Sequence, residues 1–158
     1  MTVIPHRFNW IVQGELAGMA RPGMMNSFSD DMDYLEEKGI GHIITLQENA
    51  LPAEWFSYTE IRPYHIPVDD FGIPSLEQAD GFISLMKGIV SDGNAAAVHC
   101  YAGMGRTGVF VALYWAARYG VDGPAAISSV RDISPEYIQT KEQENFVSAW
   151  ADQNQRLR

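Results

Sequence analysis

Apolar and polar residues alternate along this chain in short blocks that predict strands and helices. Residues 8–20 predict two short strands joined by a turn at Gly14. The apolar runs at 42–46 and 95–98 have the length of buried strands, and residues 60–68 alternate as an edge strand does. A strand pair followed by alternating helices and strands predicts an α/β fold. We expect a central, mostly parallel sheet of four to five strands flanked by helices.

Two helices are predicted in the first two thirds of the chain. Residues 29–38 form the first, with Ser29 as its N-cap. Its acidic residues fit a solvated face better than a metal site, and they are Asp30, Asp31, Asp33, Glu36 and Glu37. The second helix follows a capping box of Ser75 and Gln78 and ends at Gly93. Its predicted apolar face consists of Leu76, Ala79, Ile83, Met86 and Val90.

Three further helices follow, over residues 109–119, over 123–131 and after a second capping box of Thr140 with Gln143. The apolar side of the last helix consists of Phe146, Val147 and Trp150. No repeat, low-complexity tract or linker divides the sequence. We therefore expect residues 1–158 to form a single domain.

Composition narrows the class of protein. The chain has 158 residues, 46% of them apolar, and 20 acidic against 11 basic residues give a formal charge of −9. This charge disfavours nucleic acid and anionic membranes as partners. The N-terminal residues lack the apolar core of a signal peptide, and a single cysteine excludes an intrachain disulfide. We expect a cytoplasmic monomer.

Residues 98–108 concentrate unusual residue types between a predicted strand and a predicted helix. A loop entering a helix directs unpaired backbone N–H groups and the positive end of the helix dipole at one point. Gly103 and Gly105 allow the loop to curl, Arg106 adds a planar donor that suits phosphate, and the same field favours the thiolate of Cys100. These features predict an anion site with a nucleophile. A buried structural cysteine in an ordinary strand-to-helix turn is the alternative.

The same stretch has the pattern His-Cys-x5-Arg-Thr-Gly and resembles the signature of the cysteine-dependent protein tyrosine phosphatases, in their small dual-specificity branch. The resemblance implies that Cys100 forms a phosphocysteine intermediate and that Arg106 binds the phosphate. It implies that Thr107 stabilises the sulfur and that His99 forms hydrogen bonds that hold the loop in place. A buried core histidine with satisfied hydrogen bonds is the alternative for His99, and the two roles overlap here. The implied phosphate-binding loop is Tyr101, Ala102, Gly103, Met104 and Gly105. The amides and Arg106 supply the positive charge, so no metal or cofactor is expected.

A general acid is needed at the leaving oxygen. The loop before the second predicted helix offers Asp69 and Asp70, and the spacing of Asp70 to Pro74 resembles that of the acid in small phosphatases. We therefore favour Asp70.

Other candidates surround the predicted site. The resemblance places Gln139 and Gln143 where relatives position the attacking water. Glu48 follows a predicted strand and either braces the phosphate loop or Arg106, or is an ordinary loop carboxylate. For Arg21, a surface role is favoured over one in the site.

The expected substrate is phosphotyrosine, with phosphoserine and phosphothreonine as further possibilities, in a phosphorylated protein or peptide. The loop from Tyr101 to Gly105 contains no Lys or His, which disfavours a polyphosphoinositide. Two alternatives stay open: a phosphatase for a small phosphoester or phosphoinositide, and a phosphopeptide-binding module without turnover. Phosphate and other oxyanions are expected ligands in each case.

Overall fold

A computed structural model describes residues 3–155 and contains a five-stranded sheet with the order β1-β2-β5-β3-β4. The strands are β1 (Asn9–Val12), β2 (Leu16–Met19), β3 (Ile40–Thr45), β4 (Arg62–His65) and β5 (Ala95–His99). Strands β1 and β2 form an antiparallel hairpin around Gly14, which has a positive φ, and all other neighbours are parallel. The expected α/β fold, with its N-terminal strand pair on a mostly parallel sheet, is confirmed.

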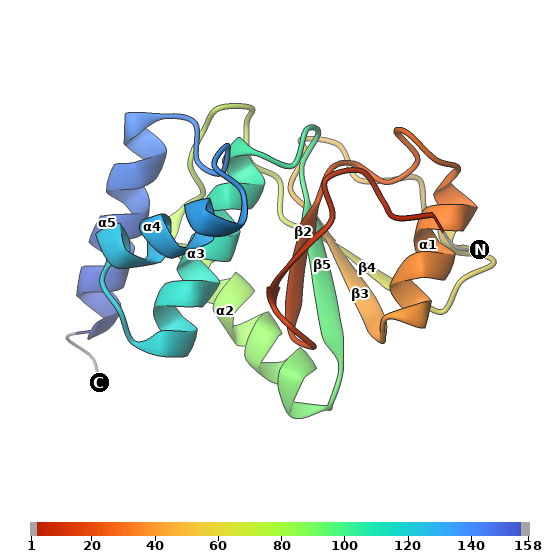
Figure 1. The fold of residues 1–158 in the computed structure, drawn as a ribbon, viewed down its shortest axis with the longest axis horizontal. Coiled ribbons are helices and arrows are strands. Elements are labelled where there is room, and N and C mark those ends of the chain that lie inside the picture. The colour runs from red at the N-terminus through yellow and green to blue at the C-terminus, as the bar shows by residue number, and fades with distance from the viewer. Residues whose placement is uncertain (1–2, 156–158) are drawn as a thin grey trace.

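Helices cover both faces of the sheet (Figure 1). On one face lies α1 (Phe28–Glu37), and the short 3-10 helix η1 (Ala53–Phe56) contributes to the same core. The other face carries α2 (Leu76–Ser91), α3 (Gly105–Tyr119), α4 (Gly123–Ile133) and α5 (Lys141–Gln155). Within residues 3–155, no helix is both long and apolar enough to cross a membrane.

Successive residues of β5 supply the two cores in turn. Ala96 and Val98 pack beneath α2 and α3, whereas Ala95 and Ala97 belong to the core beneath α1. All of β5 is buried, because a central parallel strand with helices on both faces has no solvated side. This explains the uninterrupted apolar run in the sequence.

The prediction for the first helix is wrong at two residues. The N-cap is Ser27, whose Oγ accepts from the backbone N–H of Asp30 at 3.0 Å, so Ser29 lies inside the first turn. Asp31 is buried and accepts from the N–H of Gly23 at 2.7 Å and from the side chain of Asn26. It therefore ties α1 to the preceding loop. The other acidic residues of the cluster are exposed, as expected.

Both predicted capping boxes are formed, but the apolar face of α2 differs from the prediction. Leu76 is 51% exposed, and Phe82 and Ile89 are buried in its place. The prediction followed one stripe along the helix, whereas α2 packs against both the sheet and α3 and therefore buries a broader surface. The predicted strand at 60–68 is shorter than expected, and α3 begins four residues before the predicted start, inside the signature.

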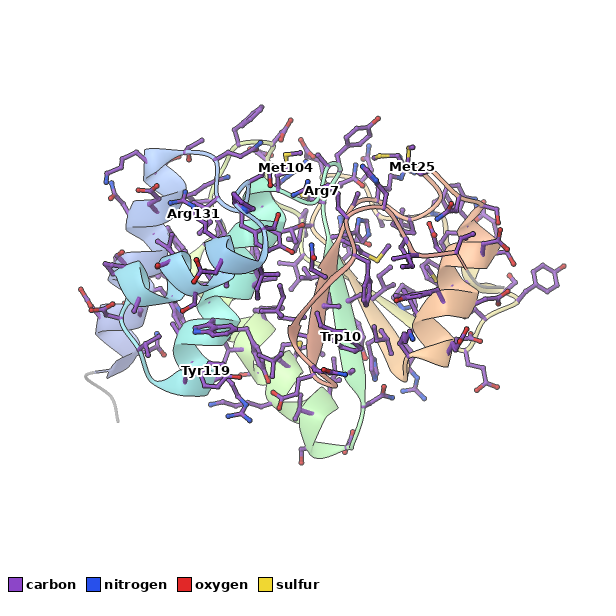
Figure 2. The ribbon with its side chains drawn as sticks, viewed as in Figure 1. Arg7, Trp10, Met25, Met104, Tyr119 and Arg131 are labelled. Carbon is purple, nitrogen blue, oxygen red and sulfur yellow. The ribbon has the colours of Figure 1, made fainter. Side chains whose placement is uncertain are left out.

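The parallel strands end in one row, at Met19, His99, Thr45 and His65. The loops that follow these residues therefore meet at the carboxyl edge of the sheet, where open α/β sheets bind ligands. Figure 2 shows Met25 and Met104, from two of these loops, along the same upper edge of the molecule.

Close contact between α3 and the segment before α5 gives a test of the packing. A Cβ on Gly108 would lie 2.3 Å from the backbone nitrogen of Ile138, so Gly108→Ala should lower the free energy of unfolding by about 2–3 kcal/mol. Gly88→Ala is the matched control, because nothing lies within 4 Å of that Cβ and alanine favours a helix interior. It should stabilise the protein by up to about 1 kcal/mol. Urea unfolding of both variants measures this, and equal values would contradict the packing.

Candidate active site

The loop between β5 and α3 forms a compact cradle with Cys100 at its floor. Cys100 is only 3% exposed. Gly103 has φ +76°, and a Cβ on it would lie 2.8 Å from the backbone of Met19 and Ala20. The signature loop thus rests directly on the end of β2, and glycine is required there both for its conformation and for the close approach.

Backbone N–H groups of this loop lack partners in the protein. Five consecutive N–H groups donate to no acceptor among the described residues, and they belong to Ala102, Gly103, Met104, Gly105 and Arg106. Unpaired N–H groups at the start of a fifteen-residue helix, together with its dipole, form an anion-binding site. The predicted cradle is therefore present in the geometry of the loop.

The sulfur of Cys100 receives a hydrogen bond from α3. Thr107 Oγ1 donates to Cys100 Sγ at 3.1 Å, and Thr107 is fully buried. Such a donor favours negative charge on the sulfur. The structure thus brings Thr107 to the atom that the sequence analysis named.

His99 lies behind the cradle and is completely buried. Its Nδ1 is 2.9 Å from the carbonyl oxygen of Cys100 and its Nε2 is 2.8 Å from Thr45 Oγ1. A carbonyl only accepts, so Nδ1 carries the proton and Nε2 accepts from the Thr45 hydroxyl. Burial lowers the pKa of His99 to about 4, although the hydrogen bond to the Cys100 carbonyl opposes the shift. His99 is therefore neutral at pH 7 and fixes the backbone of Cys100.

Arg106 is the cation of the site and is only 4% exposed. Its Nη1 donates to Glu48 Oε1 at 2.7 Å and to the carbonyl oxygen of Val68 at 2.9 Å. Its Nη2 lies 3.4 Å from Asp70 Oδ1. A buried guanidinium is costly unless such groups compensate it. Glu48 therefore braces Arg106, the alternative that the sequence left open.

Hydrogen bonds also act on Glu48 itself. Its own backbone N–H, the Arg106 guanidinium and the N–H of Asp70 hold the pKa of the Glu48 carboxyl below its usual range. The carboxylate therefore stays ionised near neutral pH and connects the loop after β3 to the loop after β4.

The two aspartates of the β4–α2 loop occupy different positions. Asp70 Oδ1 faces Arg106 and also accepts from the N–H of Phe71, which has φ +61°. The described contacts of Asp69 are backbone ones, with its carbonyl accepting from Gly72 at 2.8 Å. The geometry thus places Asp70, and not Asp69, beside the cradle.

Gln139 faces the cradle from the segment before α5, and Gln143 faces it from the first turn of α5. A Cβ on Gly105 would lie 2.7 Å from Gln139 Oε1 and 3.3 Å from Gln143 Nε2. Gln143 is buried, its Oε1 caps α5, and its Nε2 donates to the carbonyl of Gly72 at 3.1 Å. The Nε2 of Gln139 points to the sulfur of Met104 at 3.6 Å. Both side chains therefore border the site, and Gln143 combines this position with its capping role.

Thr45 and Arg21 complete the surroundings of the cradle. Thr45, whose hydroxyl donates to Nε2 of His99, was absent from the prediction, and its only signal was a hydroxyl at the end of a buried strand. The backbone N–H of Arg21 donates to the carbonyl oxygen of Tyr101 at 3.0 Å, so this residue lies beside the signature loop.

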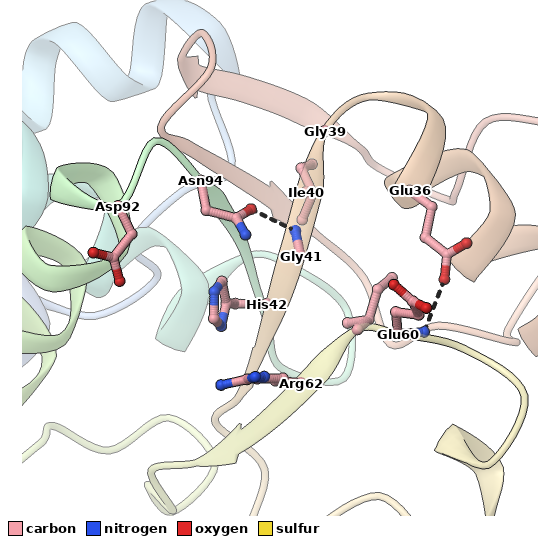
Figure 3. Close-up of a pocket in the computed structure, with 10 residues that line it drawn as sticks. Glu36, Gly39, Ile40, Gly41, His42, Glu60, Arg62, Asp92 and Asn94 are labelled. Atoms are coloured by element: carbon pink, nitrogen blue, oxygen red, sulfur yellow. Dashed lines mark hydrogen bonds between the residues drawn. The ribbon is translucent and has the colours of Figure 1, made fainter.

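A second hollow lies at the opposite, amino end of the strands and has a volume of about 580 Å³ (Figure 3). Asn94 accepts there from the N–H of Gly41, and Glu36 accepts from the N–H of Glu60. Neither Cys100 nor Arg106 lines it. Its polar side chains accept hydrogen bonds from backbone N–H groups near the starts of β3 and β4, away from the signature loop.

Comparison with known proteins agrees with the geometry. The sequence profile described as "Swiss Army Knife protein, DSP-PTPase phosphatase domain" matches residues 5–147. An uncharacterized protein of Methanocaldococcus jannaschii is 37% identical over 113 residues, which cover 68% of this chain and 74% of that protein.

Other relatives carry phosphatase names, and two of them serve as examples. Tyrosine-protein phosphatase CDC14 of Candida albicans is 29% identical over 115 residues, covering 73% of this chain and 21% of the relative. Protein tyrosine phosphatase domain-containing protein 1 of Mus musculus is 32% identical over 153 residues, covering 85% of this chain and 20% of the relative. The chain thus spans about a fifth of the length of these two proteins.

Solved structures share the fold. Tk-PTP in its active form matches with a TM-score of 0.81 at 21% identity, covering 92% of this chain and 97% of that chain. PTPMT1 in complex with PI(5)P matches with a TM-score of 0.84 at 16% identity, covering 96% and 99%. At these identities the likeness concerns the arrangement of helices and strands.

The buried neutral His99 should make stability depend on pH. An unfolded histidine binds a proton below about pH 6.5, whereas folded His99 does so only below about pH 4, so unfolding takes up a proton between these values. Because of His99, the free energy of unfolding should therefore be ~2 kcal/mol lower at pH 5 than at pH 7. Urea unfolding at pH 7 and pH 5 measures this difference in the free energy of unfolding, and His99→Asn should remove the part that is due to His99. An unchanged difference in the variant would contradict a neutral, buried His99.

Proposed function

The chain belongs to the DSP-PTPase phosphatase family, and from that premise we propose that it hydrolyses phosphotyrosine, and also phosphoserine or phosphothreonine, in proteins through a phosphocysteine intermediate. The observation that carries the proposal is the convergence on one cradle of three groups: the sulfur of Cys100, the guanidinium of Arg106 and the carboxylate of Asp70. Each group has a chemical task that its position suits.

In the first step, Cys100 attacks phosphorus as a thiolate. The unpaired N–H groups of the loop and Arg106 hold the equatorial oxygens, whose charge is spread over the cradle in the transition state. The S–P bond forms while the bond from phosphorus to the leaving oxygen breaks. Asp70 gives its proton to that oxygen, which leaves as a neutral hydroxyl.

In the second step, water replaces the sulfur. The ionised Asp70 accepts a proton from a water that attacks phosphorus, with Gln139 and Gln143 as the residues that orient it. The P–S bond breaks, and Thr107 stabilises the returning thiolate through its hydrogen bond to the sulfur. His99 holds the Cys100 backbone throughout. Inorganic phosphate leaves, and the protein returns to its starting state.

The surroundings of the cradle support a protein substrate. The rim of the site carries exposed aromatic side chains, Tyr101 at 56% and Phe71 at 58%, which suit the apolar and aromatic parts of a peptide. The loop residues from Tyr101 to Gly105 offer no Lys or His for additional phosphates. Since the chain carries a charge of −9, attraction to the anionic phosphate comes from groups in the cradle.

A phosphoinositide or small phosphoester is the second candidate substrate. One structural neighbour, PTPMT1, was solved with PI(5)P, so inositol lipids belong in any substrate panel. A module that binds phosphopeptides without turnover would not need Asp70 beside the cradle, and this disfavours it.

Hydrolysis of p-nitrophenyl phosphate between pH 4.5 and 8 tests the proposed chemistry. Cys100→Ser should abolish activity, because the alkoxide needed in its place is not available at these pH values. Asp70→Asn should lower kcat by about 10²-fold and remove the basic limb of the pH profile, because the acid is lost. Asp69→Asn, the neighbouring matched control, should retain both. Activity that persists in Cys100→Ser would overturn the phosphocysteine route, and absence of activity in the unaltered protein would favour the binding module.

Kinetic separation of the two steps tests the position of Gln139. kcat/KM includes only the steps up to phosphorylation of Cys100, whereas kcat also includes hydrolysis of the intermediate. Gln139→Ala should therefore lower kcat several-fold and leave kcat/KM for p-nitrophenyl phosphate nearly unchanged. Gln13→Ala, in the exposed hairpin turn, is the control. An equal fall in both parameters would show that Gln139 acts before the intermediate.

A further inference from the structure

Arg21 lies at the rim of the cradle, just after the end of β2. It borders two neighbouring hollows of about 370 and 330 Å³. The first also contains Glu48, the brace of Arg106, and the second contains Tyr101, the first residue after the nucleophile. The backbone hydrogen bond from Arg21 to Tyr101 fixes this position relative to the signature loop. Arg21 thus lines two hollows that each also contain a residue of the loops around the cradle.

The guanidinium of Arg21 is held by an aromatic ring. Its Cζ lies 5.7 Å from the ring centroid of Trp55, which is itself 40% exposed and packs edge-on against Phe28. Stacking on one face of a guanidinium leaves the N–H groups at its edge free to donate. Trp55 therefore presents the cation of Arg21 toward the hollow that it shares with Tyr101.

The charge of Arg21 has no partner within residues 3–155: the described residues form no ion pair and no side-chain hydrogen bond with it. Arg106, by contrast, is compensated by Glu48 and Asp70. In a chain of charge −9, a cation left unpaired next to an anion site is positioned to attract a negative group of the substrate.

We propose that Arg21, stacked on Trp55, receives the carboxylate of an acidic residue that neighbours the phosphorylated residue of a peptide substrate. The inference rests on the proposed function and adds a sequence preference to it. The phosphate occupies the cradle, and the flanking Asp or Glu reaches the hollow between Trp55 and Tyr101. Its carboxylate then accepts hydrogen bonds from the planar guanidinium.

The lining favours a carboxylate over a second phosphate. A phosphate monoester carries nearly two negative charges at pH 7 and is usually bound by several cationic groups. Here one guanidinium faces a hollow otherwise lined by aromatic, apolar and small residues, which are Pro22, Gly23, Met24, Phe28, Trp55 and Tyr101. A single charge with an aliphatic stem, as in Glu, matches that lining.

Paired phosphotyrosine peptides test the proposal. One peptide carries Glu on both sides of the phosphotyrosine and the other carries Gln, and kcat/KM is measured for each alongside p-nitrophenyl phosphate. The unaltered protein should prefer the Glu peptide about fivefold, the value expected for one solvent-accessible ion pair. In Arg21→Gln the ratio should fall to about one. In Trp55→Leu, which keeps the charge but removes the stacking, the ratio should fall partway.

Arg62→Gln is the matched control, because it removes the same charge from the far end of the sheet, where Arg62 lines the other hollow. It should leave the fivefold ratio unchanged. A ratio that persists in Arg21→Gln, or that falls equally in Arg62→Gln, would overturn the subsite. So would a larger loss in Arg21→Gln for PI(5)P in phosphatidylcholine vesicles than for the Glu peptide, which would indicate a second phosphate-binding group.

Binding measured in a Cys100→Ser background separates this proposal from the proposed function. Fluorescence anisotropy should give the same fivefold preference for the Glu peptide, and Arg21→Gln should remove it. If the preference is present but the protein with Cys100 hydrolyses neither peptide nor p-nitrophenyl phosphate, the subsite stands and the proposed function fails. If hydrolysis proceeds without the preference, the subsite fails and the proposed function stands.

Discussion

One buried cation determines the arrangement of the site. The guanidinium of Arg106 is removed from water, so its charge has to be compensated inside the protein. Glu48 and Val68 provide this compensation from the loops after β3 and β4, and Asp70 adds a further carboxylate from the second of these loops. Two loops far apart in the sequence are thereby fixed around the start of α3. The position of the expected general acid relative to the nucleophile depends on that contact.

For anion binding at this site, the net charge of the whole chain matters less than the dipoles of the backbone N–H groups that line the cradle. Exposed acidic residues are screened over about 8 Å at physiological salt, whereas the loop N–H groups would touch a bound anion directly. An acidic protein can therefore bind an anionic ester, provided that the local groups are oriented by the fold. The neutral state of His99 contributes to this orientation, because it holds the Cys100 carbonyl without adding a charge of its own.

The sequence predicted those parts of the structure that local patterns determine. The apolar runs of β3 and β5, the caps at Ser75 and Thr140, and the glycine-containing loop with Cys100 and Arg106 each lie within a few consecutive residues. The roles of Thr45 and Glu48 depend on pairing across 54 and 58 residues, which no local pattern encodes.

The errors have the same origin. Asp31 matches the pattern of a solvated helix face, but the loop that folds over α1 buries it and uses it as an acceptor. Ser27 and Ser29 are both suitable caps, and Ser27 is the one whose side chain accepts from the N–H of Asp30. Phe28, the first residue of the helix, packs its ring against Trp55 and Phe56.

The contact of Gly103 with the end of β2 has a consequence for how the protein is made. During synthesis the N-terminal hairpin emerges about eighty residues before the loop that rests on it, and β2 joins the sheet only by pairing with β5. Such long-range pairing is slow to form and contributes nothing until both strands are present. The cradle therefore takes its final shape only after β5 and the loop that follows it have been made and β5 has paired with β2.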